Sequence, residues 1–164
     1  MEIKTVSNRM YAFIVLFDLQ TTYFSSVLDG ISDQDSHNRL NTKANHIAWL
    51  TGSLVQQRFE IAGALGEERH QGAYEFFKDN KGIQDDATYP SLTAFKKDWQ
   101  IISPILRELL VNVPDEKLDA AYKMPGVSMT YFDMVSFIIY REANCIGQVA
   151  LWRRLLGYEA MKYM

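Results

Sequence analysis

Apolar residues recur at steps of three and four along the N-terminal part of the chain, which is the spacing of one buried face on an α-helix. The positions on this face are Met10, Phe13, Ile14, Phe17, Thr21, Phe24 and Leu28. Ser7 precedes them and is a favourable N-cap, while Gly30 follows them and favours the end of a helix. The pattern therefore predicts a first helix over residues 7–29.

A second helical pattern covers residues 43–65, with Asn41 or Thr42 as its cap and Gly66 as its end. Its apolar side carries Ile47, Leu50, Leu54, Ile61 and Leu65. A second stripe on the same segment carries His46, Ser53, Gln57 and Glu60. Periodicity alone favours the solvated face of the helix for this polar stripe.

Two further long helices are predicted in the second half of the chain. The third covers residues 91–111 and contains Pro104, which predicts a kink or a break into two pieces. The fourth covers residues 129–156, with Ser128 or Thr130 as its cap and Gly157 as its end. This fourth segment is apolar around most of its circumference, so it has to be covered on more than one side. We therefore expect a second subunit against its outer side, and hence a homodimer.

The connections contain shorter elements. Residues 66–90 are punctuated by glycine, aspartate and proline, with one helical turn expected at residues 73–78. Short helices are also expected at residues 32–35, which have the form of a capping box, and at residues 115–122, followed by a turn at Pro125 and Gly126. No strand pattern of any length is present. Together these elements predict one all-α domain over residues 1–164, a four-helix bundle with a long crossover connection and short extra helices.

Composition and charge disfavour several classes of function. The net charge is −3 and the charges are interspersed, so no basic block is available to neutralise the phosphates of a nucleic acid. No segment reaches the roughly 18 uncharged apolar residues that span a bilayer, and no small-residue cleavage site follows the apolar run at residues 10–17. The single cysteine cannot form an internal disulfide, which fits a reducing compartment. We therefore expect a cytoplasmic protein with no nucleic-acid or membrane partner.

The candidate chemistry lies on one face of the fourth helix, where Arg141, Cys145 and Gln148 follow one another at steps of four and three residues. An arginine keeps its charge in a protein, so inside the fold it needs a carboxylate or several carbonyl acceptors. Glu60 is the expected carboxylate partner of Arg141, and Glu142 is the alternative close to it in sequence. A further alternative is that the stem of Arg141 packs in the core while its guanidinium reaches water. Cys145 reads as a small buried hydrophobe rather than a nucleophile, because no histidine base is near it in sequence.

Two segments resemble members of the DinB/YfiT-like superfamily, and the resemblance covers nearly the whole chain. They are NHIAWLTGSL at residues 45–54 and REANCIGQVALWRRLLG at residues 141–157. The resemblance implies a four-helix bundle in which three histidines hold a divalent metal such as nickel or zinc. It also implies a thiol-dependent transferase or isomerase activity. In this sequence the three ligand positions are Ser53, Arg141 and Cys145.

None of these three residues suits the implied metal site. Serine is a poor ligand for zinc or nickel, and the fixed charge of Arg141 repels a cation. His46, two helical turns before Ser53, is a displaced histidine that cannot form a site alone. We therefore expect a metal-free protein, leaning away from an enzyme, whose altered site either binds a small anion or is purely structural. The residues of this predicted site are Ser53, Arg141, Cys145, Glu60, Gln148 and His46. The alternative is a thiol-dependent transferase or isomerase.

Overall fold

The computed structural model describes residues 3–124 and 126–163 of the chain, and it is mainly helical, as predicted. The α-helices are α1 Tyr11–Val27, α2 Asp33–Ser36, α3 Ile47–Ala64, α4 Tyr74–Phe77, α5 Leu92–Asn112, α6 Asp115–Asp119 and α7 Tyr131–Leu155. Two 3₁₀ turns, η1 Asn8–Met10 and η2 Lys78–Asn80, accompany them. The strands β1 Ala121–Met124 and β2 Val127–Thr130 form a small antiparallel hairpin.

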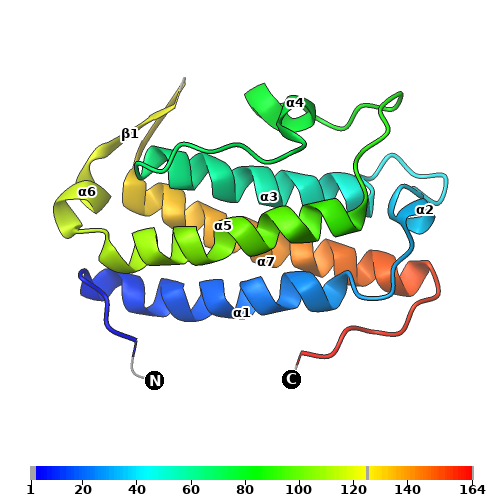
Figure 1. Ribbon diagram of the computed structural model, residues 1–164, viewed down its shortest axis with the longest axis horizontal. Helices are drawn as coiled ribbons and strands as arrows, with labels where there is room; N and C mark the ends of the chain where they lie inside the picture. Colours follow the sequence, from blue (N-terminus) through cyan, green and yellow to red (C-terminus); the bar gives the residue numbers. More distant parts are fainter. Residues whose placement is uncertain (1–2, 125, 164) are drawn as a thin grey trace.

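The four long helices lie side by side, with α1 and α3 each in contact with both α5 and α7 (Figure 1). α1 and α7 run in the same direction, because Gln20 bonds to the Ile139 carbonyl and Arg153 bonds to the Val27 carbonyl further along both helices. α3 and α5 run in the opposite direction. The long connection from the end of α3 back to the start of α5 makes this arrangement possible.

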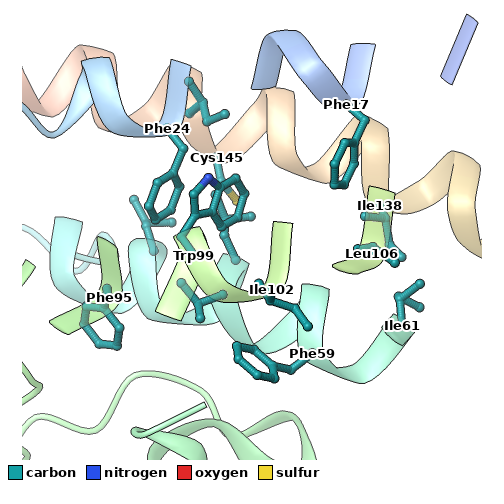
Figure 2. Close-up of a cluster of buried hydrophobic side chains, with 14 of the residues drawn as sticks. Phe17, Phe24, Phe59, Ile61, Phe95, Trp99, Ile102, Leu106, Ile138 and Cys145 are labelled. Atoms are coloured by element: carbon teal, nitrogen blue, oxygen red, sulfur yellow. The ribbon is translucent and has the colours of Figure 1, made fainter. Parts of the chain in front are cut away.

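The core between these helices is built from large apolar side chains (Figure 2). The rings of Phe24 in α1 and Trp99 in α5 stack with their centroids 3.8 Å apart. Leu106 and Ile138 bring α5 and α7 into the same cluster, and both are at most 3% exposed. Each such side chain contributes roughly 1.5–3 kcal/mol when removed from water, so this cluster supplies much of the stability of the fold.

An ion pair between Arg58 of α3 and Glu142 of α7 lies fully inside this core. The guanidinium donates Nε to Oε1 at 2.6 Å and Nη2 to Oε2 at 2.7 Å, which is the bidentate arrangement that arginine and carboxylate favour. Its Nη1 donates to the hydroxyls of Thr21 in α1 and Ser103 in α5, at 2.9 and 2.7 Å. One charged group is thereby bonded to each of the other three long helices, and it fixes their relative positions along the axis.

Aromatic rings enclose the same guanidinium. The Arg58 carbon Cζ lies 3.9 Å from the centroid of the Phe17 ring and 3.5 Å from that of the Trp99 ring. Such contacts are favourable for a desolvated cation because each ring face carries partial negative charge. Burial nevertheless lowers the pKa of Arg58, and the nearby Glu142 carboxylate opposes that shift.

The start of α3 differs from the prediction. The helix begins at Ile47 rather than at residue 43, and its N-cap is His46, whose Nδ1 accepts a bond from the Trp49 backbone N–H at 3.1 Å. Asn41 and Thr42 therefore do not cap it. The residues just before His46 stay non-helical because the Arg39 side chain bonds to the carbonyls of Lys43 and Ala44.

The predictions for α5 and α7 need smaller corrections. α5 continues unbroken through Pro104, so the predicted break is wrong. Pro104 has no backbone N–H, so the carbonyl of Gln100, four residues before it, lacks its helical hydrogen bond. Both residues are exposed, so water can bond to this carbonyl and the helix continues. α7 begins at Tyr131, and its cap is Thr130, which forms a capping box with Asp133. Ser128 belongs instead to β2.

The short elements were predicted in part. α2 with its Ser32 cap and α4 lie where short helices were expected. The helix predicted over residues 115–122 ends at Asp119, and the hairpin that follows was not predicted, because four-residue strands are too short to show alternation. Gly126 adopts a turn with φ of 76°, whereas Pro125 of the predicted turn lies outside the described residues. Within the described part of the chain, no helix is both long and apolar enough to cross a lipid bilayer.

Candidate functional site

A cavity of about 420 Å³ lies between α3 and α7 and extends to the segment around α4 and to the hairpin. Its size falls within the range of small-molecule sites, which is about 300–1,000 Å³. Most of the wall is apolar or aromatic, with Trp49, Ile61, Phe77, Met129, Met134 and Phe137 among the lining residues. The polar groups come from α3, from Arg141 of α7, from Tyr122 of the hairpin, and from Asn80 and Lys81 after α4.

The polar stripe on α3 is not a solvated face, so the prediction for it is wrong at most positions. Ser53 and Gln57 are each 8% exposed and His46 is 6% exposed, while Glu60 alone remains exposed. The α4 segment covers this side of the helix, because Gly52 has no side chain to keep the Phe77 ring away from the α3 backbone. A Cβ at Gly52 would lie 2.6 Å from Cε2 of that ring and still closer to its Cζ, nearer than real contacts allow.

Arg141 joins α7 to the polar stripe. Its Nη2 donates to Ser53 Oγ at 3.0 Å, and its Nη1 donates to the Ser53 carbonyl at 3.4 Å and to Gln57 Oε1. All these acceptors are uncharged. Within the described residues, no carboxylate lies within the 4.0 Å that defines an ion pair with Arg141. The guanidinium therefore brings a full positive charge to the cavity wall, where its hydrogen bonds go only to neutral groups.

The expected partners of Arg141 are engaged elsewhere. Glu60 lines the same cavity, but its Oε1 accepts a hydrogen bond from Gln56 Nε2 at 2.9 Å. Glu142 pairs with Arg58 in the core. The prediction of a pair with Glu60 is therefore wrong, because the Arg141 side chain reaches α3 at Ser53, about two turns before Glu60.

Two buried N–H donors of the cavity residues have no hydrogen-bond partner among the described residues. They are Nε2 of Gln57 and Nε1 of Trp49. Gln57 is oriented by Arg141, because its Oε1 accepts from the guanidinium and its Nε2 is left to face another acceptor. A buried donor without an acceptor costs about 1–3 kcal/mol, so a group that supplies an oxygen here would be stabilised.

A second set of amides holds the loop after α3 against the helix. Gln71 Nε2 donates to the Gly52 carbonyl at 3.1 Å and to Gln56 Oε1 at 2.9 Å. Gln56 in turn donates to Glu60, so the carboxylate is held in a fixed orientation at the cavity wall. Gln56 and Gln71 are both at least 95% buried, and their contact was not predicted, because Gln71 lies in an irregular connection.

The hairpin covers one end of the cavity with Tyr122, Val127 and Met129. The Tyr122 ring packs edge-on against Tyr131 with centroids 5.2 Å apart. Burial raises the pKa of the Tyr122 phenol, and the neighbouring Glu60 carboxylate raises it further. Tyr122 therefore stays protonated at neutral pH and offers a neutral hydroxyl rather than a charge.

Cys145 and Gln148 do not line this cavity. Cys145 is 6% exposed and belongs to the buried core cluster that also contains Trp99 (Figure 2). Burial raises the pKa of its thiol, although the positive charge of Arg141 acts in the opposite direction. Gln148 is exposed on α7 and donates to Asn144 Oδ1 at 2.6 Å.

His46 also lies apart from the cavity, at the start of α3. Its ring is 5.2 Å from those of His37 and Tyr89, centroid to centroid. Burial, with smaller contributions from the nearby His37 and Arg39, lowers the pKa of His46 to about 4. Of the six predicted site residues, the structure brings together Ser53, Arg141 and Glu60 and leaves Cys145, Gln148 and His46 elsewhere.

The positions expected to bind a metal do not suit one. The Arg141 guanidinium lies against Ser53, so a cation placed between them would meet a positive charge, and the Cys145 thiol is turned into the core. Within residues 3–124 and 126–163, no group of three or more His, Cys, Asp or Glu side chains is placed to hold a metal ion.

Comparisons with known proteins give no assignment for this chain. No model of a known protein family matches it, and no curated protein is significantly similar to it.

Proposed function

We propose that this protein is a DinB/YfiT-like four-helix bundle whose cavity binds a small organic anion without a metal. The observation that carries this proposal is the guanidinium of Arg141, which stands in the wall of the cavity with hydrogen bonds to uncharged acceptors only. The bundle topology is supported by two pairs of long helices joined by a crossover. The single buried cysteine supports a reducing, cytoplasmic location.

The charge of Arg141 favours an anion at this end of the cavity. A hydrogen bond to a charged partner is worth about 1.5–3 kcal/mol, roughly twice a neutral one, and it strengthens further away from water. The unpartnered Nε2 of Gln57 adds a second donor to the same region. A carboxylate, sulfonate or phosphate-ester oxygen can accept from both groups.

The rest of the cavity restricts the kind of anion. Its wall is mainly aromatic and aliphatic, so the remainder of the ligand is expected to be apolar. Glu60 and Lys81 add one negative and one positive group to the same wall, so Arg141 gives the wall a net charge of one positive unit, which matches a ligand with a single negative charge. The favoured ligand class is therefore a monoanion with one aromatic or aliphatic group.

A thiol-dependent transferase, the other function implied by the resemblance, receives no support from Cys145. Its thiol does not line the cavity, and its raised pKa keeps it protonated at neutral pH. The Ser53 hydroxyl in the wall donates to the Leu50 carbonyl and accepts from Arg141, so it is not bonded to a base that would activate it. Binding rather than catalysis is the function that these residues favour.

Isothermal titration with 3-phenylpropanoate and with its neutral amide tests the proposal. We expect the carboxylate to bind more tightly than the amide, and Arg141→Met to weaken carboxylate binding by about 10- to 100-fold, the equivalent of one charge-assisted bond pair. Arg69→Met is the control, because Arg69 is an exposed arginine that does not line this cavity.

Equal affinity for the acid and the amide would contradict the proposal. So would an Arg141→Met variant that keeps the preference for the acid. In either case Arg141 would serve only as a link between α7 and α3.

A further inference from the structure

The outer side of α7 carries a stripe of exposed residues that no other helix covers. Its members are Phe137, Tyr140, Asn144, Gly147 and Leu151, spaced by three and four residues. Phe137, Tyr140 and Leu151 are 51%, 66% and 58% exposed, which is unusual for such large apolar groups. The alternation of three and four is the spacing that keeps a stripe in contact with a second helix over several turns.

The stripe is symmetric about its own midpoint, which lies between Cys145 and Ile146. Tyr140 and Leu151 stand at equal distances from that point, and so do Asn144 and Gly147. Near the middle, a Cβ at Gly147 would meet nothing within 4 Å, so the surface there is open to close approach. An identical helix laid antiparallel across it would set Tyr140 against Leu151 and Asn144 against Gly147.

Charges at the two ends of the stripe favour the same arrangement. Asp133 stands at the start of the stripe and Arg154 at its end, and both are exposed. In the described part of the chain, Arg154 has no ion-pair partner. Antiparallel pairing brings Arg154 of one copy within about one turn of Asp133 of the other, whereas parallel pairing would bring like charges together.

We infer that this α7 stripe is a self-association surface, where two copies of the chain pack antiparallel about a two-fold axis. The two-fold requires a self-complementary patch, and the size and charge patterns of the stripe meet that requirement. A stable interface needs about 800 Å² from each partner, more than one helix face supplies. We expect the interface to extend onto α1, which packs against α7 and carries the exposed Leu16 and Leu19.

Sedimentation equilibrium of the full chain from 1 to 100 µM tests the association. We expect a dimer, and we expect Leu151→Glu to raise its dissociation constant at least about 100-fold. Ile101→Glu is the matched control, because Ile101 is an exposed apolar residue on α5 and its change should leave the dimer intact. Circular dichroism checks that each variant remains helical.

Cross-linking tests the orientation. Tyr140 and Leu151 are separated by about 16 Å along the helix, so they distinguish the two directions. We expect a disulfide between copies only when Tyr140→Cys and Leu151→Cys chains are mixed. A monomer at 100 µM, a dimer that survives Leu151→Glu, or a disulfide formed by either variant alone would overturn the inference. The first two outcomes would leave this face to a different partner.

Discussion

Replacing Glu142 by glutamine should reveal how strongly the buried ion pair holds the helices together. The side chain keeps nearly the same shape, so the change removes the charge of Glu142 and little else. Arg58 would then remain fully buried, with its hydrogen bonds to Thr21 and Ser103 but without a counter-charge. Arginine cannot relieve this by losing its proton.

The size of the effect follows from the burial of both partners. Removing one member of a buried ion pair costs about 3–5 kcal/mol, because the other charge is left in a medium that solvates it poorly. A domain of this size has a total stability of about 5–15 kcal/mol, so the loss is a large fraction of it. With about 2–4 °C of Tm lost per kcal/mol, we expect Tm to fall by roughly 6–20 °C.

Chemical denaturation of four proteins measures the effect: the wild type, Glu142→Gln, Arg58→Met and the double variant Arg58→Met/Glu142→Leu. We expect both single changes to be costly and the double variant to be much less so, since it leaves no unpaired charge. Thr21 and Ser103 tolerate the loss of Arg58, because their hydroxyls already donate to carbonyls of their own helices. A loss below about 1 kcal/mol for Glu142→Gln would refute the reasoning.

Three further predictions concern single residues. The pKa of His46 is about 4 in the folded chain and near 6.5 in the unfolded chain, so as pH falls the unfolded chain binds the proton first. The free energy of unfolding should therefore fall by at most about 3 kcal/mol between pH 6.5 and 4. His46→Asn keeps a capping side chain and should remove this pH dependence in denaturation curves. Cys145 should react with a disulfide reagent at least about 100-fold more slowly in the folded than in the unfolded chain, because its thiol is buried and its pKa is raised. Equal rates in the two states would contradict the burial of Cys145 in the core. Gly52→Ala should destabilise the protein by about 1–3 kcal/mol, because its Cβ would overlap the Phe77 ring. Gly63→Ala in the same helix should be neutral or stabilising, because a Cβ there meets nothing within 4 Å. Equal effects of the two changes in thermal unfolding would contradict the packing.

The long helices and their ends could be predicted because local signals determine them. Gly30, Gly66 and Gly157 all have positive φ, at 72°, 109° and 88°, and each follows a helix as the glycine rule requires. The start of α3 was missed because a long arginine side chain, rather than the local sequence, holds the preceding backbone away from helical geometry.

The candidate site could be predicted only where facing helices determine it. The meeting of Ser53 with Arg141 follows from two antiparallel helices, and it was expected from the resemblance. Phe77 of α4 and Tyr122 of the hairpin were not expected in the wall, because their positions depend on how short connecting segments fold back over α3. Periodicity carries no information about such segments.

One missed feature did leave a signal in the sequence. Arg58 follows Leu54 by four residues and precedes Ile61 by three, so it interrupts the apolar side of its helix. An arginine on a buried stripe requires a carboxylate, and Glu142 was available on the other apolar helix. Glu142 is adjacent to Arg141 in sequence, and this proximity favoured a local pair over the observed pair with Arg58.

A crystal structure with 3-phenylpropanoate soaked into the cavity is the most direct test of the proposed function. We expect a carboxylate oxygen within hydrogen-bonding distance, about 2.7–3.2 Å, of both the Arg141 guanidinium and Gln57 Nε2, with the phenyl ring against Trp49 and Phe137. A cavity closed by wall side chains, or a probe whose carboxylate points away from Arg141, would contradict the claim that this arginine is an anion site.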